Sequence, residues 1–232
     1  MKHIPNIITS LNLASGFIAI VLVYNGYPVI ASWVILAAMV FDFFDGFASR
    51  ALNAYSEMGK ELDSIADVIS FGAAPGLIIY TLLSASHGSD TDGWKIATVA
   101  ISALFPVCAG LRLAKFNIDD SQTTSFKGLP TPAAALAVVT VVLSAACSGS
   151  TLVKSLTASP VAIIIFSLVL SGLMVTRIPL LSLKFHNLKL KGNEGRFLLI
   201  GVVILLVALF RFAGIPLIIP AYVAVSLISL LF

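Results

Sequence analysis

The sequence predicts an all-α integral membrane protein, a polytopic bundle of about eight transmembrane helices. Of its 232 residues, 59% are hydrophobic and only 11% are charged, against about 25% charged residues in an ordinary soluble domain. The mean hydropathy is +1.04. Long apolar runs recur along the whole chain, and about 20 such residues cross the hydrocarbon core of a bilayer as a helix.

The apolar runs are separated by turn-forming segments. "YNGYP" (24–28) ends the first run, and "HGSDTDG" (87–93) ends the third. The first run has no basic segment or cleavage site before it, so we expect it to be retained and not removed as a signal peptide. The last two runs are short and meet at "AGIP" (213–216), so a re-entrant pair is an alternative to two full spans. The expected spans are 7–25, 29–50, 62–86, 94–114, 129–148, 158–177, 197–212 and 216–232.

The distribution of Lys and Arg predicts the orientation. With eight spans, one side of the membrane holds only Lys95, Lys154 and Arg211. Because cytoplasmic loops carry the excess of basic residues, we expect both termini in the cytoplasm and the protein in the cell (inner) membrane. This bias accounts for the net charge of +3 without a nucleic-acid partner. The basic residues expected on the cytoplasmic side are Lys2, Arg50, Lys60, Arg112, Lys115, Lys127, Arg177, Lys184, Lys189, Lys191 and Arg196.

Four aspartates interrupt the apolar stretch "FDFFDGFASRALNAYSEMGKELDSIADVIS" (41–70). Asp42 and Asp45 are three residues apart at the end of the second run, and Asp63 and Asp67 are four apart in the third. These spacings place each pair on one helix face. Two consecutive antiparallel helices would therefore direct the carboxylates into a common cleft near the cytoplasmic boundary.

Such a cluster needs compensation. One aspartate at mid-bilayer costs roughly 2.5–3.5 kcal/mol, and neighbouring carboxylates repel one another. Either a cation binds among them or several stay protonated. Oxygen ligands suit Mg²⁺, Mn²⁺ or Ca²⁺, and four aspartates would hold two ions. Helix capping, or pairing with Arg50 and Lys60, is the purely structural alternative.

The residues around the aspartates indicate a phosphate-bearing ligand. Gly46 and Gly59 permit close approach to the backbone. Arg50 carries a fork-shaped donor suited to phosphate oxygens. A divalent metal site beside these residues favours a phosphorylated substrate over a bare ion.

At this point the stretch resembles the signature of the CDP-alcohol phosphatidyltransferase family: D-x2-D-G-x2-A-R, eight residues, G, three residues, D, three residues, D. The chain has every fixed spacing, and its one departure is Ser49 in place of the usual alanine. Further segments resemble the bacterial and archaeal phosphatidylserine synthases of that family: "PNIITSLNLASGF" (5–17), "DVISFGAAPG" (67–76), "LRLAKFN" (111–117), "FKGLPTPAAA" (126–135) and "LMVTRIPLLSLK" (173–184).

The resemblance implies a reaction, CDP-diacylglycerol plus L-serine giving phosphatidylserine and CMP, and a homodimer among membrane lipids. It divides the chain into a transferase membrane domain (1–185) and two additional C-terminal helices (186–232). In the family the four aspartates hold the metals, and the last, here Asp67, is the proposed general base. The residues that the resemblance assigns to the CDP-lipid are Asn6, Thr9, Gly46, Ser49, Arg50 and Gly59. Asn6 has a structural alternative as a cap of the first helix.

The carboxylate of serine would require a cation. Arg112 is the first candidate, followed by Lys115, Arg177 and Lys184, and each has an alternative as a snorkelling residue of the cytoplasmic side. The loop from Phe126 to Pro132 would form a wall of the acceptor pocket.

Two other functions compete with this one. A related transferase would use glycerol phosphate, inositol phosphate or another alcohol, but a phosphorylated acceptor favours more arginines than this chain has. A divalent-cation transporter would place its site at mid-membrane, usually between internal repeats, which the sequence does not show.

Overall fold

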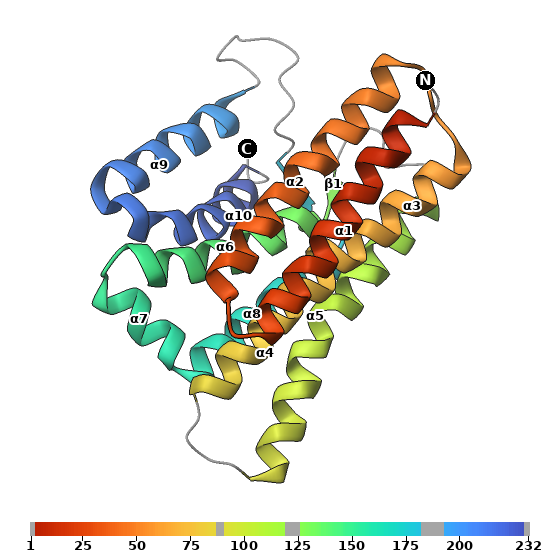
Figure 1. Ribbon diagram of the computed structural model, residues 1–232. Helices are drawn as coiled ribbons and strands as arrows, with labels where there is room; N and C mark the ends of the chain where they lie inside the picture. The colour runs from red at the N-terminus through yellow and green to blue at the C-terminus, as the bar shows by residue number, and fades with distance from the viewer. Residues whose placement is uncertain (1–2, 87–90, 119–125, 182–192, 230–232) are drawn as a thin grey trace.

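The structure is a computed structural model that describes residues 3–86, 91–118, 126–181 and 193–229. Its described part is a bundle of helices (Figure 1) with one very short β-ladder. The helices are α1 (Ile4–Tyr24), α2 (Pro28–Ala51), α3 (Glu57–Asp67), the π-helical η1 (Val68–Ala73), α4 (Ala74–Ser86), α5 (Asp92–Ile118), α6 (Thr131–Cys147), α7 (Thr151–Ala158), α8 (Pro160–Val175), α9 (Glu194–Phe210), the 3₁₀ helix η2 (Arg211–Leu217) and α10 (Ile218–Ile228).

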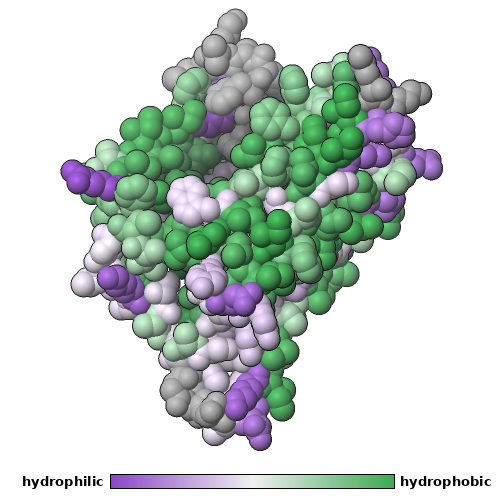
Figure 2. All heavy atoms as spheres, in the orientation of Figure 1, coloured by the Kyte–Doolittle hydropathy of each residue, from purple (hydrophilic) through white to green (hydrophobic). Residues whose placement is uncertain are grey.

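The predicted fold class is confirmed. Among the described residues, five helical stretches are long and apolar enough to cross a membrane: Ile4–Tyr24, Pro28–Ala51, Glu57–Ser86, Asp92–Ile118 and Glu194–Ile228. The shorter helices α6 and α8 are also apolar. Figure 2 shows hydrophobic side chains over most of the visible face, with hydrophilic ones mainly at its edges. A soluble protein would bury this surface, so the molecule is a polytopic membrane protein.

The last of these stretches folds back on itself. A Cβ added at Gly214 in η2 would lie 2.4 Å from the carbonyl oxygen of Leu206 in α9. A Cβ at Gly195, at the start of α9, would lie 3.2 Å from Cβ of Ser229, just beyond α10. Helices α9 and α10 therefore form an antiparallel hairpin that turns at the predicted "AGIP" break. Two full spans and a re-entrant pair both require this hairpin.

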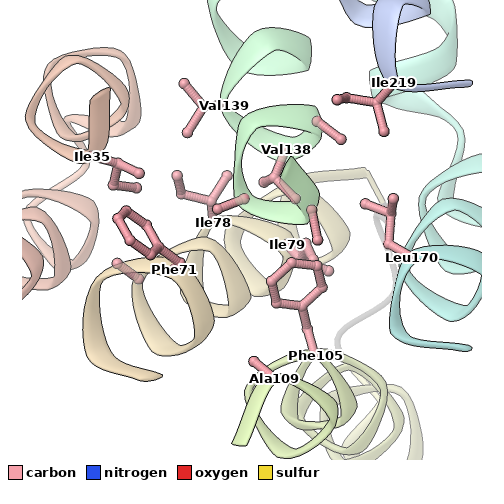
Figure 3. Close-up of a cluster of buried hydrophobic side chains, with 14 of the residues drawn as sticks. Ile35, Phe71, Ile78, Ile79, Phe105, Ala109, Val138, Val139, Leu170 and Ile219 are labelled. Atoms are coloured by element: carbon pink, nitrogen blue, oxygen red, sulfur yellow. The ribbon is translucent and has the colours of Figure 1, made fainter. Parts of the chain in front are cut away.

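Helix α6 lies at the centre of the bundle. In Figure 3, Val138 of α6 points between Ile78 and Ile79 of α4, while Leu170 of α8 and Ile219 of α10 approach from the other side. Most of the buried residues of α6 are alanine or valine. Small side chains let helix backbones approach closely, which is the main source of helix association within a bilayer.

Glycines bring three helices together around η1. A Cβ at Gly72 would lie 3.2 Å from Cβ of Ala109 in α5. A Cβ at Gly76 would lie 2.9 Å from Cδ of Pro106 in the same helix. On the opposite side, a Cβ at Gly16 of α1 would lie 2.3 Å from Oγ of Ser70. The Ser70 hydroxyl donates a hydrogen bond of 2.9 Å to the carbonyl of Asn12. The π-helical turn is thus held between α1 and α5, directly after Asp67.

A short β-ladder joins the loops before α6 and after α8. Strand β1 (Phe126–Lys127) pairs antiparallel with β2 (Pro179–Leu180). The backbone N–H of Gly128 donates to Ile178 O, and that of Leu129 donates to Leu173 O, both at 2.9 Å. Gly128 has a φ of +77°, and a Cβ there would lie 2.7 Å from the carbonyl oxygen of Thr176. These contacts restrain the backbone directly before α6.

Replacing Gly16 should destabilise the protein. Gly16→Ala forces its new methyl group against the backbone and side chain of Ser70, and overpacking of this kind costs about 1–3 kcal/mol. We expect a lower midpoint of thermal unfolding in detergent. The matched control is Gly172→Ala in α8, where an added Cβ meets nothing within 4 Å. An unchanged midpoint for Gly16→Ala would contradict the close packing of α1 on η1.

Candidate functional site

Three of the four predicted aspartates come together between α2 and α3. Asp42, Asp63 and Asp67 each place a carboxylate oxygen within 4.8 Å of the others. Only residues 52–56 separate the two helices, and α2 ends where α3 begins, at the end of the bundle that holds the N-terminus (Figure 1). Ser56 caps α3, because its hydroxyl accepts a hydrogen bond of 3.0 Å from Gly59 N–H. The predicted convergence of carboxylates from the two helices is therefore found for these three side chains.

Asp45 lies outside this group of three. It is three residues beyond Asp42 on α2, which moves it about 4.5 Å along the helix axis and about 60° around it. Its side chain is buried, with 6% of its surface exposed, and it lines an adjoining pocket together with Asp63. A role of Asp45 in metal binding remains a prediction.

The donor set fits a hard divalent cation. Asp45, Asp63 and Asp67 each bury one carboxylate oxygen that has no hydrogen-bond partner among the described residues. A buried carboxylate without a partner is strongly unfavourable. Oxygen-only ligands from several carboxylates are those that Mg²⁺, Mn²⁺ and Ca²⁺ prefer. Cation binding would supply the missing partner to these atoms.

A pocket of about 200 Å³ opens beside the aspartates. Five of the six residues that the family resemblance assigned to the CDP-lipid line it: Asn6, Thr9, Gly46, Ser49 and Gly59. The sixth, Arg50, is exposed, and its guanidinium group lies 3.7 Å from the position of a Cβ on Gly46. It therefore reaches back over α2 toward the pocket. Several polar side chains line this pocket, and such groups fix the orientation of a bound ligand.

Two glycines give the pocket its shape. A Cβ at Gly59 would lie 3.0 Å from the side-chain oxygens of both Asn6 and Ser56, so a larger residue would displace Asn6. At Gly46 an added Cβ would make only ordinary contact with Arg50. Gly59 is thus needed for packing within the protein, whereas Gly46 leaves space on the pocket side of α2.

Among the predicted acceptor residues that the structure describes, Arg112 has an electrostatic connection to the cluster. Its Nη1 donates a hydrogen bond of 3.1 Å to the Thr131 hydroxyl, and its charge interacts with that of Asp67. Its Nε is buried without a hydrogen-bond partner in the described part of the chain. The other candidates are placed less favourably, since Lys115 and Arg177 are exposed and Lys184 lies outside the described residues.

Sequence reasoning missed several residues of this region. Ser56, Tyr55 and Lys60 also line the pocket, and Thr131 orients Arg112. Asn12 is fully buried, and neither polar atom of its side chain has a described partner. Its spacing of three residues from Thr9 places both on one face of α1, which was the available signal for Asn12. No local pattern connects Thr131 with Arg112.

A membrane helix bundle with clustered carboxylates beside a small polar pocket defines the class of protein. Comparison with known families then identifies it, because the sequence model of CDP-alcohol phosphatidyltransferases matches residues 2–173. The chain belongs to the CDP-alcohol phosphatidyltransferase family, and it is a membrane-embedded transferase.

Several relatives share one name. The chain is 35% identical over 188 residues to the CDP-diacylglycerol–serine O-phosphatidyltransferase of Bacillus subtilis, an alignment that covers 80% of this chain and 94% of the relative. It is 40% identical over 141 residues to the Helicobacter pylori protein of the same name, covering 60% and 56% of the two chains. The archaetidylserine synthase of Methanothermobacter thermautotrophicus is 33% identical over 137 residues, covering 58% and 55%.

Removing one carboxylate of the cluster should weaken metal binding. Asp63→Asn deletes a charge and a carboxylate ligand, so we expect the dissociation constant for Mn²⁺ to rise by about tenfold or more, or ~1.4 kcal/mol. Isothermal titration of the purified protein measures it. Asp92→Asn, at an exposed aspartate in the first turn of α5, is the matched control. Equal affinities for the two variants would show that the cluster does not hold the metal.

Proposed function

We propose that the protein transfers the phosphatidyl group of CDP-diacylglycerol to the hydroxyl of L-serine and releases CMP. The observation that carries this proposal is the position of the Asp42–Asp63–Asp67 cluster beside the pocket lined by the signature residues Asp45, Gly46 and Gly59. The serine acceptor is supported by the shared name of the relatives, above all by the Bacillus subtilis protein, which aligns over 94% of its length.

The pocket would bind the cytidine diphosphate headgroup. Asn6 and Thr9 of α1 offer hydrogen-bonding side chains, and Arg50 offers two N–H groups to the diphosphate. Gly46 leaves room for the phosphates to approach α2. The acyl chains remain in the bilayer, since the pocket lies at the end of the bundle. The four aspartates would hold two divalent cations, Mg²⁺ or Mn²⁺, which neutralise the diphosphate and stabilise the leaving CMP.

Asp67 would accept the proton of the serine hydroxyl. As the oxygen of serine forms its bond to the phosphorus that carries diacylglycerol, the bond from that phosphorus to the CMP oxygen breaks. The serine proton passes to the Asp67 carboxylate during the attack, and CMP leaves with the electron pair of the broken bond. Direct attack of this kind inverts the configuration at phosphorus and forms no covalent enzyme intermediate. Catalysis then rests on positioning and electrostatics.

Arg112 would bind the carboxylate of serine. The Thr131 hydroxyl accepts a hydrogen bond from Nη1 of Arg112. The Nε–H donor of Arg112 is buried and has no hydrogen-bond partner among the described residues. Because Arg112 also interacts with Asp67, a serine held by its carboxylate would present its hydroxyl near the proposed base. A charge-assisted bond to a carboxylate is stronger than a neutral one.

The proposed setting is the cytoplasmic face of the cell membrane. Arg50, Lys60 and Lys115 belong to the loops and helix ends at the site end of the bundle, whereas Lys95 and Lys154 belong to the opposite end. By the positive-inside rule, this distribution supports a cytoplasmic location for the pocket and both termini. We further propose a homodimer, and a transferase domain (1–185) to which the C-terminal hairpin is added.

The acceptor is tested by CMP release. The purified protein is supplied with CDP-diacylglycerol and Mn²⁺, with serine, glycerol phosphate, inositol phosphate or no acceptor. We expect release with serine and its loss in Asp67→Asn. Release only with a phosphorylated alcohol would replace serine while keeping the family reaction. Metal binding without release for any acceptor would favour a cation transporter.

Arg112→Gln should impair the use of serine selectively. Loss of the charged hydrogen bond, worth about 1.5–3 kcal/mol, raises the KM for serine by about tenfold or more, while the KM for CDP-diacylglycerol stays unchanged. Steady-state kinetics with each substrate varied in turn measure both constants. Lys154→Gln, an exposed position on α7, serves as the control. Equal increases in both KM values would show that Arg112 does not act at the serine site.

A further inference from the structure

Helix α10 of the C-terminal hairpin is hydrogen-bonded to the backbone of one residue in the loop after α8. The Tyr222 hydroxyl of α10 donates a hydrogen bond of 3.0 Å to Leu181 O, and Leu181 N–H donates one of 3.2 Å to Ser226 Oγ. Tyr222 is 8% exposed and Ser226 is fully buried. One turn of α10 thus satisfies both backbone polar groups of Leu181, which directly follows strand β2.

The β-ladder connects Leu181 to the start of α6. Leu181 follows β2, which pairs with β1, with Phe126 opposite Leu180. Of the following residues, Gly128 donates its N–H to Ile178, between α8 and β2, and Leu129 donates its N–H to Leu173 in the last turn of α8. We call residues 126–129 and 178–181 the ladder segment. Thr131 lies two residues after Leu129. It is the first residue of α6 and accepts the hydrogen bond from Arg112.

Tyr222 also lies near enough to Arg112 for a charge on either group to affect the other. The ladder segment, which leads to Thr131, and the Tyr222 ring therefore both lie in the neighbourhood of Arg112.

We propose that Tyr222 and Ser226 are positioning residues for the acceptor site, which hold the ladder segment and thereby the Thr131–Arg112 pair in place. Both residues lie beyond the part of the chain that the family model matches, residues 2–173. The C-terminal hairpin is then a working part of the transferase and not an appendage. The assignment of Arg112 to the serine carboxylate rests on the proposed function.

The physical basis is the placement of one flexible cation by irregular backbone. An arginine side chain has several rotatable bonds, and its guanidinium group keeps a productive direction only if its partners are fixed. Thr131 is fixed by the ladder segment, whose own buried backbone groups must be paired. Release of Leu181 loosens this support without removing any group that touches substrate.

The test is Tyr222→Phe, which keeps the ring and deletes only the hydroxyl. We expect the KM for serine to rise about fivefold, which corresponds to ~1 kcal/mol, with kcat and the KM for CDP-diacylglycerol unchanged. Tyr80→Phe, at a half-buried tyrosine of α4, is the matched control. Ser226→Ala should reproduce the effect, whereas Ser102→Ala, whose hydroxyl bonds only within α5, should not.

A double variant separates positioning from general loosening. In the Arg112→Gln background, Tyr222→Phe should produce no additional rise in the KM for serine, because the group it positions is already absent. The proposal would be overturned by a fivefold rise in the KM for serine in that background as well. Equal increases in the KM values for serine and CDP-diacylglycerol would also overturn it.

Hydrogen exchange tests the same inference without reference to the acceptor. Peptides that cover residues 126–131 and 178–181 should exchange faster in Tyr222→Phe than in wild type or Tyr80→Phe. If wild type uses another alcohol in place of serine, the proposed function fails, and the KM for that alcohol takes the place of the KM for serine. Unchanged exchange, or faster exchange with an unchanged acceptor KM, would each refute the positioning role.

Discussion

The mutual repulsion of buried carboxylates is the constraint on which the rest of this structure depends. Asp67 is buried, Asp42 and Asp63 are half-buried, and all three bring oxygens within 4.8 Å of one another. The Coulomb energy of like charges at such distances is large where burial excludes water. Nothing in the local helices favours this proximity. It is imposed by the α2–α3 hairpin and by the packing beneath it, and a bound cation would offset its energy.

The packing beneath the cluster is built from small residues. Gly16 admits the π-helical turn after Asp67 against α1, and Gly72 and Gly76 admit α5 on the other side. A π-helical turn is a strained, uncommon conformation that is often found at functional sites. Here it directly follows the cluster residue Asp67 and contains the core residue Phe71. The rigidity of the site therefore comes from helix packing within the membrane, and not from contacts among the aspartates themselves.

The sequence predicted those features that depend on neighbouring residues. The i+3 and i+4 spacings of the aspartates and the apolar run lengths were sufficient to predict the bundle and most of the cluster. The displacement of Asp45 from the other three was not anticipated, since the argument from helix faces ignored the 60° rotation between i and i+3. The pairing of Arg112 with Thr131 and the grip of Tyr222 on Leu181 were also missed. Those contacts join residues 19 and 41 positions apart, and no periodicity in the sequence records such tertiary contacts.

The central claim is that the cluster binds a divalent cation. The most direct test is to locate a bound cation in a crystal of the protein. A crystal of the protein grown with Mn²⁺ would be measured for anomalous scattering near the manganese absorption edge. The account predicts a strong anomalous peak bounded by the carboxylates of Asp42, Asp63 and Asp67. A peak elsewhere in the bundle, or none at a concentration that supports activity, would contradict it.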